Sequence, residues 1–417
     1  MIRAVLTLAP DGQTAAAVHS AVSVLQERLP VRHLGLVPDY WYGGGAAGGF
    51  ARQGVPSVTL PRPSGDRRPW WEASDPEAEL DDALPSILSV LDDTARPFSP
   101  LLVVVDDRGP LEVALIRHAE SSAIPVVLVQ HGPNVPLAFR RSGVRAATRR
   151  VASPQDTLRA MRRRLVANTP KNLPAVLPAG HNGSYPICTY SGHAHDLLRA
   201  SGVSVGRLRP TGYPGFDRLL SMNRSEEADP QRVLVISSGW GLFGAVDRSS
   251  AFFHLVASVA GSSRRFGFDI RLKRRDEERL LPRRARQALD AAGVTLVPPD
   301  EPVPEVVGRY GLVVGDSSSA LLESVVVGVP IVVLSYADLP QWDQPTLDTE
   351  IRRELSPLEL EGGGRHEDVL VTATQPGYLE ALRDRLFAAE RHFFHALDGR
   401  CGRRAADVLL ELLDPAS

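Results

Sequence analysis

The sequence predicts an α/β protein made of two doubly wound units. Apolar strand-like runs alternate with amphipathic helical segments in both halves of the chain, and the alternation restarts after the polar segment 223–230. With 417 residues, the chain is also too long for one ordinary hydrophobic core. Strands separated by helices form parallel sheets covered on both faces. We therefore expect two Rossmann-like domains that face each other across a cleft, where folds of this kind bind ligands.

The first half of the chain follows this βαβ pattern. The segment 43–49 is rich in glycine but lacks the GxGxxG spacing, so we interpret it as a mobile surface loop and not as a phosphate cradle. A helix within 193–203 and a strand leading to a turn within 208–220 continue the pattern. The other strands are expected at 4–8, 32–37, 57–60, 101–105 and 126–130, and the other helices at 13–28, 77–92 and 111–122.

The second half repeats the pattern. Strands are expected at 233–237, 269–273, 294–298, 312–314 and 331–334, and helices at 304–309, 377–394 and 403–413. The chain is thereby divided into an N-terminal domain, 1–222, with a basic insertion at about 133–180, and a C-terminal domain, 231–397. The remaining residues, 398–417, contain a helix that we expect to pack back on the first domain.

Composition and charge exclude several classes of function. A net charge of −2 and a pI near 6.6 do not fit a general nucleic-acid binder, which needs a strongly basic face. Cys188 and Cys401 form neither a disulfide framework nor a CxxC pair, which favours a reducing compartment. The first ten residues are typical of a strand and not of a signal peptide, and no apolar run reaches the ~18 residues of a membrane span. We expect a cytoplasmic protein.

The segment 140–164 is strongly basic. It contains nine arginines and a single acidic residue, Asp156. Such a face could hold an anionic acceptor or contact the inner face of a membrane, where each positive charge near anionic lipid contributes about 1 kcal/mol. A solvated helix face is the alternative of equal weight.

The segment 311–334, GLVVGDSSSALLESVVVGVPIVVL, contains the strongest candidate site. An apolar strand leads through Asp316 to three serines, Ser317, Ser318 and Ser319, where a helix begins. Free N–H groups and partial positive charge gather at a helix start, so serine hydroxyls there suit a phosphorylated ligand without a metal. A single serine would only cap the helix. Three in succession favour a phosphate site.

Three motifs occur in order between Leu101 and Leu334. They are an apolar strand ending in His131-Gly132, the sequence TGYPGFD at 211–217, and the serine segment. Together they resemble the motifs of the GT-B superfamily of nucleotide-sugar glycosyltransferases, and within it the CDP-glycerol glycerophosphotransferases of teichoic-acid synthesis and the related capsule-polymer transferases. The resemblance implies transfer of a sugar or polyol-phosphate from a nucleotide-activated donor to a hydroxyl acceptor, in synthesis of a cell-envelope polymer or glycoconjugate.

The resemblance also implies a role for each matching position. His131 would be the general base that takes a proton from the acceptor hydroxyl, a task that suits an imidazole near neutral pH. The three serines would hold the donor's diphosphate in the C-terminal domain, and the N-terminal domain would bind an acceptor that is polymeric or lipid-linked. Glu323 would accept hydrogen bonds from the ribose, with a helix-surface glutamate as the competing interpretation. The remaining site residues are Gly239 for the donor and Gly132, Tyr213 and Asp217 for the cleft and hinge.

Two positions depart from the family pattern. The family has a His-Pro pair where this chain has Lys273 and Arg274, and an arginine where it has Gly215. Lys273 and Arg274 belong to the predicted donor site because they could stabilise a leaving diphosphate. They cannot replace the acid–base chemistry of a histidine, since both stay charged well above neutral pH. A non-catalytic pseudo-transferase is therefore one alternative, and a UDP-N-acetylglucosamine 2-epimerase, which shares the fold, is another.

Histidine pairs elsewhere in the chain do not predict a metal site. His193 and His195 fall where a helix starts, so side chains two positions apart diverge. His392 and His395 share the face of a predicted helix, but no carboxylate or cysteine cluster accompanies them. We predict no cofactor and no metal, with the nucleotide-activated donor as a substrate.

Overall fold

The computed structural model divides the chain into two compact units. Unit 1 holds the described residues of Met1–Asn134, Arg159–Arg218 and Glu390–Ser417, and unit 2 holds those of Leu219–Ala389. The predicted basic insertion at 133–180 lies outside the described residues. The described residues are 2–38, 45–61, 76–107, 109–132, 183–222, 225–226, 228–240, 246–273, 277–278, 281–298, 301, 303–335, 347–362 and 364–414.

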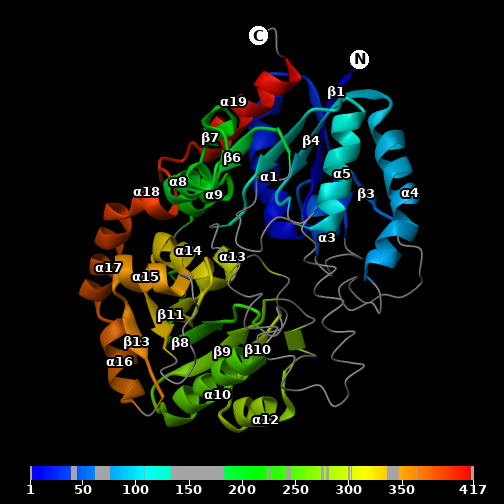
Figure 1. The fold of residues 1–417 in the computed structure, drawn as a ribbon. Helices are drawn as coiled ribbons and strands as arrows, with labels where there is room; N and C mark the ends of the chain where they lie inside the picture. Colours follow the sequence, from blue (N-terminus) through cyan, green and yellow to red (C-terminus); the bar gives the residue numbers. More distant parts are fainter. Residues whose placement is uncertain are drawn as a thin grey trace. The chain divides into compact units, whose positions relative to one another are not determined.

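Unit 1 contains a seven-stranded sheet in the order β3-β2-β1-β4-β5-β6-β7 (Figure 1). All its described pairings are parallel, and Val5 of β1 lies between His33 of β2 and Leu101 of β4. The strand order reverses between β1 and β4, as in doubly wound sheets. The strands are β1 (Ile2–Leu8), β2 (Val31–Val37), β3 (Ser57–Thr59), β4 (Phe98–Val104), β5 (Val126–Val129), β6 (Ile187–Thr189) and β7 (Leu208–Pro210).

Helices cover both faces of this sheet because successive strand residues point to opposite sides. Leu6 belongs to the core that includes Ile87 of α4 and Leu115 of α5. Val5 belongs to the core on the other face, where the C-terminal helix α19 packs against α1. The helices are α1 (Gly12–Gln26), α3 (Ala46–Arg52), α4 (Pro76–Ala95), α5 (Pro110–Ser121), α8 (Gly192–Ala200), α18 (Glu390–Phe393) and α19 (Cys401–Leu413), with a 3₁₀ turn η2 (Val205–Arg207); α9 (Gly215–Leu220) contains the boundary with unit 2.

Unit 2 contains a second parallel sheet, in the order β10-β9-β8-β11-β12-β13. Its order also reverses once, between β8 and β11, so the predicted architecture of two Rossmann-like units is confirmed. The strands are β8 (Asp229–Ile236), β9 (Gly267–Arg271), β10 (Thr295–Val297), β11 (Tyr310–Gly315), β12 (Ile331–Leu334) and β13 (Leu358–Leu360). The helices are α10 (Val246–Ser262), α12 (Arg283–Ala291), α13 (Val303–Val307), α14 (Ala320–Val327), α15 (Leu347–Leu355), α16 (His366–Ala373) and α17 (Pro376–Ala388).

Two predictions of local structure are wrong. The glycine-rich segment is not a loop throughout, because residues from Ala46 onward form α3. Its glycine serves helix packing: a Cβ on Gly49 would come within 2.4 Å of the Cα of Gly12 at the start of α1. The single helix expected at 377–394 is two helices, since α17 ends at Ala388 and α18 begins at Glu390. Neither a short helix nor a break of one residue changes apolar periodicity enough to be recognised.

No helix in the part of the chain that the structure describes is long and apolar enough to cross a membrane.

A buried histidine lies within the core of unit 1. His33 is 5% exposed; its Nε2 lies 2.9 Å from the hydroxyl of Thr7, and its Nδ1 lies 3.1 Å from Nδ1 of His19. Burial, and to a smaller extent the neighbouring His19, lowers the pKa of His33 to about 3. The folded protein therefore keeps this imidazole neutral at pH values where the unfolded chain protonates it.

We expect this difference to make unit 1 sensitive to acid. As the pH falls below 6.5, the usual pKa of a histidine, His33 binds a proton in the unfolded chain but stays neutral in the folded state. Between about pH 7 and about pH 5 the contribution of His33 should fall by about 2 kcal/mol. Urea unfolding of His33→Asn should show a weaker pH dependence than the wild type, whereas His254→Asn, at an exposed position of α10, should not. Equal pH dependence in the wild type and His33→Asn would contradict this account.

Candidate functional site

The candidate donor site lies at the carboxyl edge of the unit 2 sheet, where the strand order reverses. Two loops meet there, 237–240 after β8 and 316–319 after β11, and we call them the switch-point loops. Ligands of doubly wound sheets bind at this position, outside the carboxyl ends of the strands. The predicted serine segment is one of the two loops.

Asp316 joins the two switch-point loops. Its carboxylate is fully buried and accepts hydrogen bonds from the hydroxyl of Ser238 and the indole N–H of Trp240 in the first loop. In its own loop, the backbone N–H of Ser317 donates to it at 2.7 Å. Ser317 N–H also donates to Ser238 Oγ, at 3.1 Å. Two strand ends are thereby held in one arrangement by a single side chain.

A buried arginine compensates the charge of Asp316. Nε of Arg248, in the first turn of α10, lies 3.7 Å from Oδ2 of Asp316, and Arg248 is only 9% exposed. Its guanidinium carbon is 4.0 Å from the centre of the Trp240 ring, a cation–π distance. A buried carboxylate requires such a partner, since an unpaired charge in the interior is strongly destabilising.

The three serines do not play equal parts. The backbone N–H of Ser317 is used to join the loops, as described above. Ser318 Oγ accepts a hydrogen bond of 3.3 Å from the backbone N–H of Ala320, at the start of α14. Ser319 occupies the N-cap position, and its side chain makes no capping hydrogen bond. All three are half-buried, so the predicted phosphate position is reachable from solvent.

A second buried carboxylate, that of Glu277, joins the end of strand β9 to the loop after β8. Glu277 is 1% exposed; it accepts hydrogen bonds from the hydroxyl of Ser237 and, at 2.7 Å, from the backbone N–H of Lys273. Burial raises the pKa of Glu277, and these two hydrogen bonds offset part of that rise. The side chain of Lys273 is exposed. Arg274, predicted to act with it, lies outside the described residues.

Two further predicted donor residues lie in unit 2. Gly239 has φ of +72°, a left-handed conformation that favours glycine, and its N–H donates to Ser237 Oγ at 3.1 Å. Glu323 is 4% exposed in the first turn of α14, so the interpretation as a helix-surface glutamate is wrong. Its contact with a ribose stays a prediction.

His131 follows β5 at the carboxyl edge of the unit 1 sheet and is half-buried. Its Nδ1 lies 2.9 Å from the carbonyl oxygen of Val105, which follows β4. A carbonyl can only accept, so Nδ1 carries the proton and Nε2 is left as the basic nitrogen of the neutral ring. This is the tautomer that a general base needs. At Gly132 an added Cβ would meet no described atom within 4 Å, so no steric contact requires glycine there.

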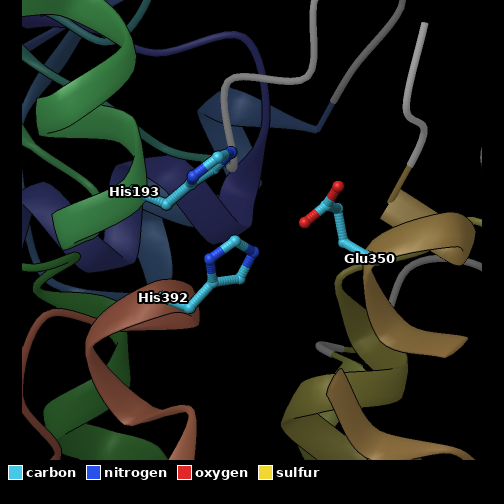
Figure 2. Close-up of side chains that lie close together, drawn as sticks. All are labelled: His193, Glu350 and His392. Atoms are coloured by element: carbon cyan, nitrogen blue, oxygen red, sulfur yellow. The ribbon is translucent and has the colours of Figure 1, made fainter. Parts of the chain in front are cut away.

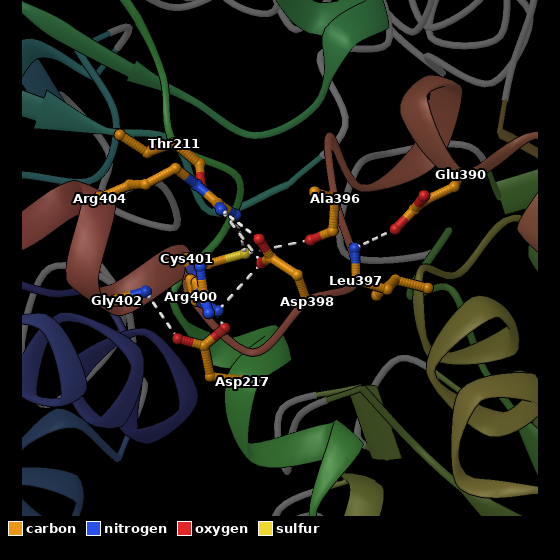
Figure 3. Close-up of polar contacts among 10 residues, drawn as sticks. All are labelled: Thr211, Asp217, Glu390, Ala396, Leu397, Asp398, Arg400, Cys401, Gly402 and Arg404. Atoms are coloured by element: carbon orange, nitrogen blue, oxygen red, sulfur yellow. Dashed lines mark hydrogen bonds and ion pairs between the residues drawn. The ribbon is translucent and has the colours of Figure 1, made fainter.

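The TGYPGFD motif makes interior contacts of unit 1. Tyr213 is 4% exposed and stacks on Tyr190, with ring centres 5.5 Å apart. The carboxylate of Asp217 accepts from the backbone N–H groups of Cys401, at 2.9 Å, and Gly402, at 2.7 Å, at the start of α19 (Figure 3). The motif thus anchors the C-terminal helix, and a hinge role for Tyr213 and Asp217 stays a prediction.

Two histidines from distant parts of the sequence meet in unit 1. His193 of α8 and His392 of α18 have ring centres 4.2 Å apart (Figure 2). His193 and His195 lie in a helix, as predicted. The expected shared helical face of His392 and His395 is wrong, because α18 ends at Phe393 and His395 has φ of +80°.

The architecture of this chain is similar to that of several proteins of known structure. No protein-family model and no curated protein sequence matches the chain. Among solved structures, a UDP-N-acetylglucosamine 2-epimerase matches with a TM-score of 0.61 at 13% identity, over 98% of this chain and 95% of the other. A UDP-GlcNAc 2-epimerase from Neisseria meningitidis bound to UDP-GlcNAc gives 0.55 at 15% identity, over 99% and 100%. A UDP-glucosyltransferase from Polygonum tinctorium gives 0.54 at 14%, over 99% of each chain.

The chain has the GT-B fold. The fold that the sequence motifs implied is therefore confirmed, and both enzyme classes considered from the sequence occur among its structural neighbours. At these identities the likeness shows the fold alone, so the donor and the reaction have to be argued from the residues.

Sequence reasoning missed the residues that hold the donor site together. Trp240, Arg248 and Glu277 were not singled out, and Asp316 was noted only as the residue before the serines. A signal was present for two of them, since Trp240 stands four residues after the end of β8 and Asp316 directly follows β11. The pairing of these side chains could not be seen, because the partners are far apart in the sequence: Ser238 and Trp240 are 78 and 76 residues from Asp316, and Ser237 is 40 residues from Glu277.

We expect Glu277→Gln to stabilise unit 2 increasingly as the pH rises. The raised pKa means that the folded state holds this proton more readily than the unfolded chain, so ionisation above the usual value of 4.5 costs stability. The unfolding free energy of Glu277→Gln minus that of the wild type should therefore increase from about pH 4 to about pH 7. Glu380→Gln, at an exposed position of α17, is the matched control. A difference that does not vary with pH would contradict the raised pKa.

We expect Asp217→Ala to loosen α19. The substitution leaves two N–H groups at the helix start without their acceptor, at a cost of about 2 kcal/mol. Because Cys401 is a buried free cysteine beside Asp217, its labelling by a thiol reagent should become faster, while the exposed-site control Asp384→Ala should label like the wild type. Unchanged labelling in Asp217→Ala would show that other contacts hold the helix.

Proposed function

We propose that the protein is a transferase that moves a sugar or polyol-phosphate from a nucleotide-activated donor to a hydroxyl acceptor. The observation that supports this most is the arrangement of the switch-point loops. Two buried carboxylates, Asp316 and Glu277, fix three strand ends around the start of α14. Fixed N–H groups and hydroxyls at a helix start suit the phosphates of a nucleotide.

The donor of the proposal contains a diphosphate. The structural neighbours named above include proteins described with UDP-linked sugars, and the sequence motifs resemble those of CDP-glycerol transferases. Ser318 and Ser319, with Lys273 and Arg274, would hold the phosphates of either donor. The departure from the family at Lys273 bears on the chemistry more than on binding, because a cation can still stabilise a leaving phosphate.

The proposed reaction balances as a single group transfer. Nε2 of His131 takes the proton of the acceptor hydroxyl, and the acceptor oxygen bonds to the donor's anomeric carbon or, for a polyol-phosphate, to its phosphorus. The bond from that atom to the nucleotide's phosphate oxygen breaks, and the nucleotide leaves with the electron pair. It leaves as a diphosphate after sugar transfer and as a monophosphate after polyol-phosphate transfer. The residues on the phosphates stabilise the charge, so the proposed reaction needs no metal.

The acceptor is the least defined part of the proposal. We infer a hydroxyl of a polymer or a lipid-linked saccharide of the cell envelope, as in teichoic-acid or capsule synthesis, from the motifs alone. The basic segment 140–164 would bind an anionic acceptor or a membrane surface. The protein would then act in the cytoplasm, at the inner face of the membrane.

A 2-epimerase is the second candidate. The matching epimerase superposes with a TM-score of 0.61, against 0.54 for the glucosyltransferase. The two reactions differ in their need for a second substrate. Formation of an epimerised nucleotide sugar with no acceptor present would favour the epimerase.

Donor binding is tested by isothermal titration with CDP-, UDP-, GDP- and CMP-linked compounds. We expect at least one to bind, and Ser318→Ala to weaken its binding by about tenfold through loss of one hydroxyl contact. Ser191→Ala is the control, because the hydroxyl of Ser191 likewise accepts a backbone N–H at the start of a helix, from Ala194 at 3.1 Å, in unit 1. Binding by none of the compounds, or unaltered binding in Ser318→Ala, would overturn the donor site.

Catalysis is tested separately at His131. His131→Gln should bind the donor as the wild type does and lose turnover by at least about 100-fold, the usual contribution of a general base. His254→Gln, at an exposed position, should keep full turnover. Full turnover retained by His131→Gln would overturn the role of His131 as general base, and biological activity retained without any turnover would favour the non-catalytic binder.

A further inference from the structure

The proposed donor site contains an electrostatic conflict. Asp316, whose carboxylate is buried, directly precedes the three serines that would hold a phosphate. Its carboxylate also accepts a hydrogen bond from the backbone N–H of Ser317, the first of these serines. Two negative groups close to each other repel, and the repulsion is stronger when one of them is buried, as Asp316 is. An anion can bind there only if the charge of Asp316 is neutralised locally.

Arg248 has the geometry for this task. Its Nε lies 3.7 Å from Oδ2 of Asp316, and its guanidinium carbon lies 4.0 Å from the centre of the Trp240 ring. The same indole donates its N–H to Asp316, so the three side chains form one cluster in which Arg248 lies over the indole face and Asp316 lies at the indole edge. Arg248 is 9% exposed, which shields its charge from salt and water. A planar guanidinium can stack and pair in this way, whereas a lysine ammonium cannot.

We propose that Arg248 is a positioning residue that supplies the counter-charge of Asp316, and so permits a nucleotide's phosphates to bind at Ser317–Ser319. The proposal rests on the proposed function, since it concerns the same donor site. Arg248 does not need to touch the ligand: it acts through Asp316 and Trp240. Trp240 contacts both the cation and the carboxylate and so sets the distance between them. Hydrogen bonds that involve Ser238 and Ser317 hold the two switch-point loops in place relative to Asp316.

This role makes a charge-specific prediction about pairs of substitutions. Arg248→Met keeps much of the side-chain volume and removes the cation, so it leaves Asp316 uncompensated and should weaken UDP or CDP binding by at least about tenfold. Removing the carboxylate as well, in Arg248→Met/Asp316→Asn, should restore binding to within about threefold of the wild type. A purely structural role predicts the opposite, since the double variant loses more contacts than the single one.

Isothermal titration of the full chain with UDP, CDP and the uncharged nucleoside uridine tests the proposal. We expect Arg248→Met to lose affinity for the diphosphates far more than for uridine, and the double variant to recover it. Circular dichroism and thermal unfolding check that each variant is folded. If Arg248→Met does not fold, two other variants test the proposal. Arg248→Met/Asp316→Asn should bind within about threefold of the wild type, and the single variant Arg248→Lys should retain part of the affinity.

The outcomes separate this proposal from the one it rests on. A wild type that binds neither diphosphate overturns both. A wild type that binds while Arg248→Met binds equally well overturns the role of Arg248 alone, as does a double variant that binds no better than Arg248→Met. Equal losses for UDP and uridine would show that Arg248 only maintains the fold.

Discussion

The carboxyl edge of the unit 2 sheet is organised around one buried carboxylate. Asp316 stands at the end of β11, at the reversal of the strand order, and its two oxygens take hydrogen bonds from both switch-point loops. A buried ionised group must be fully paired, so its presence dictates what surrounds it. The hydroxyl of Ser238, the indole of Trp240 and the guanidinium of Arg248 all meet that requirement. The helix start at Ser319 is fixed as a consequence.

The same device recurs along the edge of the sheet and in unit 1. Adjacent serines face different carboxylates, since Ser237 bonds to Glu277 and Ser238 to Asp316. The ends of β9, β8 and β11 are therefore joined in succession. In unit 1 the carbonyl after β4 orients His131, and Asp217 takes the first N–H groups of α19. Polar side chains at strand ends, and not the apolar core, set the positions of the groups proposed to act on substrates.

The structural neighbours show that very different sequences adopt this fold. At 12 to 15% identity the chain still matches epimerases and glycosyltransferases over nearly their whole length. Apolar strands and covering helices tolerate substitution as long as their pattern is kept. Proteins with the same fold can catalyse different reactions, so the fold alone does not identify the reaction. Transfer and epimerisation differ in their need for a second substrate, and the fold does not reveal that need.

The resemblance of three motifs to those of a known family implied the GT-B fold. The sequence by itself determined the parallel α/β architecture and the place of the serine segment at a strand-to-helix junction. These features follow from local patterns: apolar runs such as 312–314, their helical spacers, and a glycine such as Gly328, which ends α14 with φ of +94°. Only the tertiary structure decided that Asp316 pairs with Trp240 and Arg248, that Gly49 packs against Gly12, and that His193 meets His392. Such contacts join segments far apart in the chain, and their free energy depends on burial and on the partner's geometry. Neither quantity is encoded in the spacing of residues along one segment.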